Sequence, residues 1–159
     1  AVRHLKKENE NFVPDLVGFF EDEYKEQVKE LEKHSIAHFY GFQSDPRPFY
    51  IEADCVVLPS YHEGMSNVLL EAAATGRPVI TSNIPGCRES VENGKSGLLV
   101  EVKNKEMLYD AMKEMLHCSR EEREQMGQAG REKMESEFRK EVVVEKTVQS
   151  LREDEKRDF

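Results

Sequence analysis

PSYHEGMSNVLLEAAATGRP, residues 59–78, is the stretch that decides the fold of this chain. The run before it, residues 55–58 (CVVL), is short, apolar and β-branched in its middle, which predicts a buried strand covered on both faces. Ser66 is the predicted N-cap of a helix over residues 68–74, which a glycine and a proline then stop. The backbone N–H groups of residues 64–68 should therefore surround a helix N-terminus, which is a site suited to a phosphate.

Strand-like apolar runs alternate with helical patterns along almost the whole chain, which predicts an α/β fold with a parallel sheet flanked by helices. Strands are expected at residues 12–17, 36–40, 55–58, 78–81 and 97–100, and the other helices at residues 22–34, 48–53, 87–92, 105–116, 121–135 and 140–153. Gly127 and Gly130 lower the helix propensity of residues 121–135, so the sequence defines the ends of this helix less sharply. Ligands of open parallel sheets bind outside the carboxyl ends of the strands, so the predicted ligand-binding rim comprises residues 18–20, 41–42, 60–67 and 83–88.

The composition sets limits on the class of protein. The 159 residues are 38% hydrophobic and 35% charged, enough for one domain with a core beneath a charged surface. The net charge of −9 argues against a nucleic-acid partner, because such binding needs a basic face. Three cysteines without CxxC spacing predict reduced thiols in a cytoplasmic protein, with Cys55 buried and inert. No apolar run approaches the roughly 20 residues that span a bilayer, and the first residues resemble a helix tail, which predicts a piece of a longer protein.

Two carboxylates flank the start of the predicted helix, at Glu63 and Glu71. An acid/base pair of the glycosidase type needs carboxyl groups roughly 5 to 9.5 Å apart, whereas eight helical positions span about 12 Å along the axis. The spacing therefore favours contacts with two different parts of one extended ligand, with its phosphates on the amides between them. The simpler alternative is that Glu71 is a solvated helix carboxylate and that Glu63 only favours the helix dipole. Spacing alone does not decide between the two.

The run EGMSNVLLE, residues 63–71, closely resembles the E-x7-E signature of retaining, nucleotide-sugar-dependent glycosyltransferases of the GT-B, family 4 type. The resemblance covers nearly the whole chain, including VGFFEDE, HFYGFQSDPRPFYIEADCVVLPS and GRPVITSNIPGCRESVENGKSGLLV, and its character is that of bacterial enzymes for capsule, O-antigen or other lipid-linked glycans. It implies that residues 1–152 form the C-terminal, donor-binding, Rossmann-like domain of a GT-B fold. The final helix would reach back toward an N-terminal domain, and residues 153–159 would form a charged tail.

The resemblance also implies roles for single residues. Glu63 corresponds to the acidic residue that holds the donor sugar and steadies charge near the anomeric carbon, so it is the candidate catalytic residue. Glu71 corresponds to the carboxylate that binds the ribose. The implied donor-binding residues are Gly18, Phe19, Gly41, Phe42, Gly64, Met65, Ser66, Asn67, Val68 and Glu71. The family also uses an Arg and a Lys upstream of this region to neutralise the diphosphate, and neither is assigned in this chain.

Other residues at the rim have simpler expected roles. His62 is expected to be exposed, and Arg88 with Glu89 to form a local ion pair. The aromatic residues offer ring faces to a base, but most are expected to lie in the core; they are Phe19, Phe20, Phe42, Phe49 and Tyr50.

The expected function is that of the donor-binding domain of a cytoplasmic glycosyltransferase, peripheral at the inner membrane face in its full-length form. A nucleotide-sugar, with UDP the expected nucleotide, is the donor, and no metal or other cofactor is implied. The acceptor glycan and any membrane contact would belong mainly to the N-terminal domain, so the domain alone should be inactive. Two alternatives remain at this point: a noncatalytic nucleotide-binding or interaction module of the same fold, and half of a sugar-nucleotide epimerase, of which EGMSNVLLE is not a hallmark.

Overall fold

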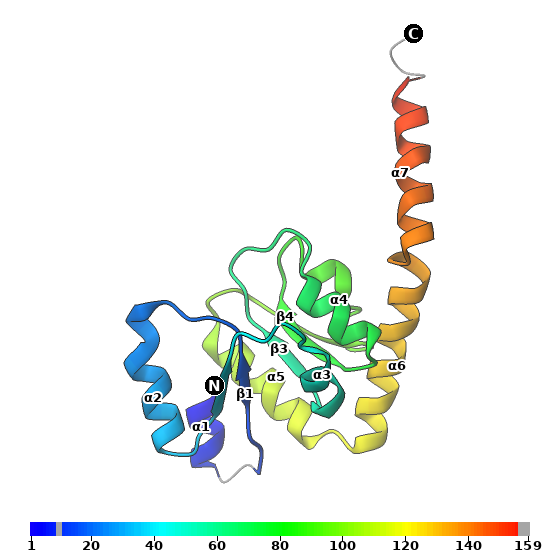
Figure 1. The fold of residues 1–159 in the computed structure, drawn as a ribbon. Helices are drawn as coiled ribbons and strands as arrows, with labels where there is room; N and C mark the ends of the chain where they lie inside the picture. Colours follow the sequence, from blue (N-terminus) through cyan, green and yellow to red (C-terminus); the bar gives the residue numbers. More distant parts are fainter. Residues whose placement is uncertain (9–10, 156–159) are drawn as a thin grey trace.

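The structure, a computed structural model, describes residues 1–8 and 11–155 and has parallel strands with helices on both faces (Figure 1). This confirms the predicted α/β architecture. The elements in chain order are α1 (Val2–Lys7), β1 (Asp15–Val17), the 3₁₀ turn η1 (Asp22–Tyr24), α2 (Lys25–Lys33), β2 (His38–Gly41), α3 (Arg47–Glu52), β3 (Val56–Leu58), α4 (Asn67–Ala74), β4 (Val79–Ser82), the 3₁₀ turn η2 (Arg88–Ser90), β5 (Gly97–Val100), α5 (Lys105–His117), α6 (Arg120–Glu137) and α7 (Lys140–Glu155).

The strands form two parallel sheets rather than the single sheet that the sequence predicts. β1 pairs with β2, and β4 lies between β3 and β5. No described strand pairs with the second edge of β1 or of β3. Because β3 is an edge strand, its Val57 remains 36% exposed, so the prediction that this strand is covered on both faces is wrong. The strand buried at every position is β4, which has a neighbour on each side.

Most predicted boundaries lie within two residues of those in the structure, and two elements differ more, each for a physical reason. β1 begins at Asp15 rather than at residue 12, because Pro14 has no N–H to donate to a neighbouring strand. The helix expected at residues 87–92 is only the turn η2, because the chain returns to an extended conformation at Val91 (φ −129°, ψ 131°). α7 continues through the boundary expected at residue 153. Residues 156–159 of the predicted tail lie outside the described residues.

The core of the larger sheet is divided by β4, whose alternate side chains enter two hydrophobic clusters. Val79 belongs to the cluster that packs against α3 and α4, with Tyr50, Leu69, Ala72, Cys87 and Val91. Ile80 belongs to the cluster beneath α5, with Leu98, Val100, Ala111 and Met115. The larger sheet therefore packs against α4 on one face and α5 on the other.

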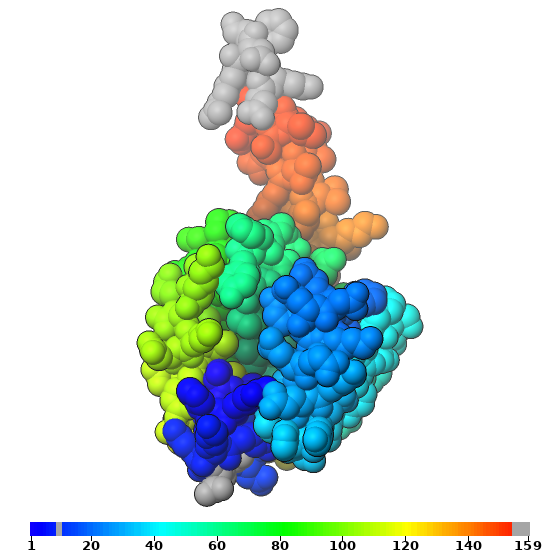
Figure 2. Space-filling view, turned by 90° about the vertical axis from the view of Figure 1, so that its left-hand side faces the viewer, coloured from blue at the N-terminus to red at the C-terminus, as the bar shows by residue number. Residues whose placement is uncertain are grey.

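The two ends of the chain are attached differently. α1 contains the fully buried Leu5 and contacts α5, and the space-filling view shows these two segments side by side (Figure 2). α7 follows α6 and projects beyond the body of the domain (Figure 1). Its exposed apolar side chains are Val143, Val144, Val148 and Leu151. That α7 reaches toward another domain remains a prediction. None of the helices in the described part of the chain is long and apolar enough to cross a membrane.

α4 approaches α6 at a pair of glycines, Gly76 and Gly127. A Cβ atom on Gly127 would lie 1.9 Å from the carbonyl oxygen of Gly76, which itself ends the α4 region with a φ of +73°. Gly130, one turn later, has ordinary spacing, because its Cβ would lie 3.6 Å from the Cβ of Ala73. α6 runs unbroken through both glycines. Gly127 lowers the helix propensity of α6, but a residue with a side chain at this position would prevent the close packing of α4 on α6.

Gly127→Ala is expected to lower the free energy of unfolding by about 2 kcal/mol or more, because the backbone of Gly76 must move away from the new methyl group. Gly130→Ala is the matched control in the same helix. It should be neutral or stabilising by up to about 1 kcal/mol, because alanine is the better helix former. Urea unfolding of both variants, followed by circular dichroism, measures the difference. Equal destabilisation by the two substitutions would show that the Gly76 contact does not matter.

Candidate functional site

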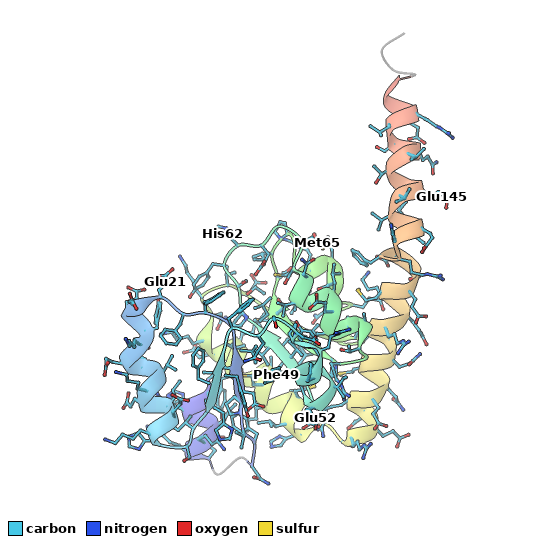
Figure 3. All side chains as sticks on the ribbon, in the orientation of Figure 1. Glu21, Phe49, Glu52, His62, Met65 and Glu145 are labelled. Carbon is cyan, nitrogen blue, oxygen red and sulfur yellow. The ribbon has the colours of Figure 1, made fainter. Side chains whose placement is uncertain are left out.

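The candidate site lies at the carboxyl ends of the strands, where the loops after β1, β2, β3 and β4 emerge. Figure 3 shows His62 and Met65 on the loop between β3 and α4 at this end of the domain, and Glu52 at the opposite end. His62 is exposed, as expected. The four predicted loops therefore belong to one end of the molecule, although they rise from two sheets.

The loops after β1 and β2 are joined by a backbone hydrogen bond and a ring contact. The Gly18 N–H donates to the Gly41 carbonyl oxygen at 2.9 Å, and both glycines have positive φ values, +129° and +66°. The rings of Phe19 and Phe42 stack with centroids 4.9 Å apart at an interplanar angle of 9°. They are 83% and 61% exposed, so the expectation that most rim aromatics are core residues is wrong here. The parallel pairing of β1 with β2 brings the two glycines together, and the two phenylalanines that follow them form one exposed stacked pair.

The N-terminus of α4 is only partly satisfied by the protein. The predicted N-cap, Ser66, occupies that position with extended backbone (φ −76°, ψ 105°), but its hydroxyl makes no cap hydrogen bond. Ser66 is 3% exposed, and within residues 1–8 and 11–155 no group is hydrogen-bonded to its hydroxyl. Its N–H donates to the Gly86 carbonyl oxygen at 3.0 Å. This corrects one part of the prediction, because the Ser66 amide is occupied.

The other four predicted amides have no acceptor among the described residues; they belong to Gly64, Met65, Asn67 and Val68. They lie at the positive end of the α4 dipole. Together with the Ser66 hydroxyl they provide hydrogen-bond donors for an anion without a cationic side chain.

Both predicted carboxylates are held by hydroxyl groups. The partly buried Glu63 accepts a hydrogen bond of 2.6 Å from the Ser60 hydroxyl, within the loop that precedes α4. Glu71 is exposed on α4 and accepts a hydrogen bond of 3.1 Å from the Tyr50 hydroxyl of α3. The two carboxylates therefore lie on either side of the unoccupied amides in the chain, and each has a neutral donor.

The loop after β4 supports the loop that carries Glu63. Gly86 has a φ of +87°, and a Cβ atom there would lie 1.8 Å from the Gly64 carbonyl oxygen. Its N–H donates to the Glu89 carboxylate at 2.8 Å, so the expected ion pair of Glu89 with Arg88 is replaced by a bond to the backbone. Sequence reasoning missed Gly86, Ser60 and Tyr50 as supporting residues. A Pro-Gly dipeptide such as residues 85–86 is typical of a turn, but no local signal indicates the contact of Gly86 with Gly64.

The cysteines take no part in this arrangement and are all free thiols. Cys55 is partly exposed rather than buried as predicted, because it precedes the edge strand β3. Burial of its thiol nevertheless raises the pKa to about 12. The reactive thiolate is therefore scarce at neutral pH.

Sequence comparison assigns most of the chain to one family model. The model described as "Glycosyl transferases group 1" matches residues 1–133. A curated relative is the capsular polysaccharide biosynthesis glycosyltransferase CapM of Staphylococcus aureus, which is 33% identical over 102 residues. That alignment covers 64% of this chain and 27% of CapM, so the chain spans about a quarter of the length of this relative.

Structure comparison matches the chain to similar domains. The C-terminal domain of a group 1 glycosyl transferase family protein, LpcC of Francisella tularensis, superposes with a TM-score of 0.71 at 26% identity, over 88% of this chain and 76% of that one. Alr3699/HepE of Anabaena, solved in complex with UDP-glucose, superposes with a TM-score of 0.73 over 87% of this chain and 40% of that one. At 20% identity the second likeness concerns the fold alone. The predicted fold, the C-terminal half of a GT-B structure, is confirmed.

Gly86→Ala is expected to lower the free energy of unfolding by about 3 kcal/mol or more and to shift the amide resonances of Gly64 and Met65. An alanine at positive φ costs about 1 to 2 kcal/mol by itself, and the clash with the Gly64 carbonyl adds to it. Gly94→Ala is the control, because Gly94 has a similar φ of +77° and no atom within 4 Å of its Cβ position. Urea unfolding and ¹H–¹⁵N spectra compare the two. If both variants lose the same stability, the contact between the two loops contributes nothing.

Proposed function

This chain belongs to the group 1 glycosyltransferases, and we propose that it is the donor-binding domain of a retaining enzyme of that family. The longer protein would transfer a sugar from a nucleoside diphosphate to a sugar or lipid-linked acceptor in surface glycan synthesis. Similarity to CapM supports the surface-glycan assignment. The UDP-glucose complex of Alr3699/HepE supports uridine as the base. A separate N-terminal domain would hold the acceptor.

The observation that carries the proposal is the set of unoccupied donors at the start of α4. Four backbone amides and the Ser66 hydroxyl lie in the chain between two carboxylates that are already held in place. A diphosphate suits the donors, because phosphate oxygens accept several N–H bonds and favour the positive end of a helix dipole. The net charge of −9 is no obstacle, since local dipoles outweigh distant charges at this range.

The order of the groups along the chain suggests the order of the ligand. Glu63 precedes the amides and would hold hydroxyls of the transferred sugar. Glu71 follows them and would accept hydrogen bonds from the ribose. The glycine loops with the Phe19–Phe42 pair would contact the base and the diphosphate. This arrangement extends one ligand from Glu63 toward the smaller sheet.

The proposed chemistry requires stabilisation of a leaving group. When the bond to the anomeric carbon breaks, the nucleoside diphosphate gains negative charge, and preorganised N–H dipoles lower the energy of that state. Glu63 would steady the positive charge that develops on the sugar. Departure and attack on the same face, within one ion-pair-like complex, retain the configuration and need no protein nucleophile. Ser60 and Gly86 would serve this step by keeping the loop of Glu63 in place.

UDP is expected to bind this chain with a dissociation constant between micromolar and millimolar, because part of the cleft belongs to another domain. Asn67→Pro tests the site directly, since proline is tolerated at the first helical position and removes a single N–H. The extended conformation of Ser66 suits a residue before proline. Loss of one charged hydrogen bond should weaken binding about tenfold or more, which corresponds to about 1.5 kcal/mol. Calorimetry and chemical-shift titration measure the affinity.

Two control variants separate the amide from other effects. Asn67→Ala keeps the N–H and removes the side chain, so it should change the affinity by less than about threefold. Arg120→Pro places proline at the first position of α6, which has an extended N-cap residue, and should leave binding unchanged. UDP-induced shifts confined to the end of the domain that carries Glu52, or equal affinities for all variants, would refute the proposed site.

Glu63→Ala in the full-length protein is expected to lower turnover by roughly a hundredfold, about 2.7 kcal/mol, which is typical of one lost electrostatic contact with a transition state. The affinity for UDP alone should hardly change, because the bare nucleotide has no sugar to contact Glu63. Glu52→Ala, at the opposite end of the domain, is the control. Initial rates of sugar transfer and a UDP titration give the two numbers. Near-normal turnover would contradict the catalytic role and would show that Glu63 only interacts with the helix dipole.

A further inference from the structure

Tyr50 contacts the candidate ribose carboxylate from inside the core. Its ring lies in the hydrophobic cluster with Leu69 and Ala72 of α4, and the residue is 7% exposed. Its hydroxyl is at the margin of that cluster and donates to Oε2 of Glu71 at 3.1 Å. The donor therefore comes from a ring that packing has already fixed, whereas the acceptor belongs to an exposed side chain.

The hydrogen bond occupies only part of the acceptor capacity of Glu71. An ionised carboxylate has about four acceptor positions on its two oxygens. Among the described residues, Tyr50 is the only group hydrogen-bonded to this carboxylate. Oε1 and the remaining position on Oε2 are therefore open to two neighbouring hydroxyl groups of a ligand.

Arg47, a cation whose charge interacts with that of Glu71, is paired with another carboxylate. Arg47 lies one turn before Tyr50 on α3, and the pKa of its guanidinium is raised mainly by its hydrogen bonds and charge interaction with Asp45, with a smaller contribution from the charge of Glu71. That guanidinium donates two hydrogen bonds, of 2.7 and 2.8 Å, to Asp45. Glu71 therefore has a neutral donor, and a ligand does not have to displace a cation.

Tyr50 remains a donor throughout the neutral range. Burial and the adjacent Glu71 carboxylate raise the pKa of its phenol to about 12. Both effects disfavour the phenolate. The hydroxyl therefore keeps its proton at any pH at which the domain works.

We propose that Tyr50 is a positioning residue of the nucleotide site: its hydroxyl holds Oε2 of Glu71 so that Oε1 faces the adjacent ribose hydroxyls of a nucleoside diphosphate. The inference rests on the proposed function, because it assigns Glu71 to the ribose. It adds α3 to the site, although α3 itself need not touch the ligand. Tyr50 contributes to the free energy of nucleotide binding by restricting Glu71 to one conformation before the ligand binds.

The test compares UDP with 2′,3′-dideoxyuridine diphosphate, titrated into the wild-type chain, Tyr50→Phe, Glu71→Ala and the double variant. Tyr50→Phe should lower the affinity for UDP about fivefold, which corresponds to one ordinary hydrogen bond. It should leave the affinity for the dideoxy analogue unchanged. Glu71→Ala should weaken UDP about tenfold or more. The double variant should match Glu71→Ala, because the hydroxyl then has nothing to position.

Tyr40→Phe is the matched control, since Tyr40 is exposed and no described group is hydrogen-bonded to its hydroxyl. Urea unfolding of Tyr50→Phe should match the wild type, because the ring is retained. Three results would overturn the proposal. Tyr50→Phe could lower the affinities for UDP and for the analogue equally, or it could leave the affinity for UDP unchanged while Glu71→Ala lowers it. The third is that the losses of affinity of the two single variants add up in the double variant. If the wild-type chain binds neither ligand, the proposed function fails first and this inference fails with it.

Discussion

The contact between Gly86 and the loop before α4 is the constraint on which the candidate site depends. Parallel pairing of β3 with β4 brings the loops after these strands together, and the absent side chain of Gly86 lets the two backbones touch. The Gly86 carbonyl then takes the N–H of Ser66. One amide of the α4 terminus is thereby used to fix the loop, and its neighbours are left for a ligand.

Hydroxyl groups, rather than cations, hold the acidic residues of the site. Ser60 donates to Glu63 and Tyr50 donates to Glu71. A neutral donor restricts the rotamer of a carboxylate without neutralising its charge, so both groups can still accept further hydrogen bonds. The candidate site thus combines a helix terminus suited to an anion with two hydrogen-bonded carboxylates, in a protein whose net charge is negative. Local hydrogen-bond geometry matters more here than the overall field.

The two halves of the site rise from different sheets, which no described strand joins. The aromatic pair of Phe19 and Phe42 follows the smaller sheet, whereas the amides of α4 follow the larger one. Outside the sheets, α1 carries the fully buried Leu5 and contacts α5, and Glu8 forms an ion pair of 2.7 Å with Lys113 of α5. Exposed ion pairs contribute little stability. Burial of Leu5 is therefore the stronger contribution to the placement of α1.

The sequence by itself determined the α/β class, most element boundaries to within two residues, the start of α4 and the two carboxylates, because hydrophobic period, capping residues and the E-x7-E run are local signals. Only the tertiary structure decided which strand is buried on both faces, since that depends on neighbours in the sheet. It also decided that Gly127 is needed for the approach of α4 to α6, that Gly86 occupies one of five candidate amides, and that Tyr50 orients Glu71. Each of these joins residues 20 or more positions apart in the sequence, and no periodic pattern records such a contact.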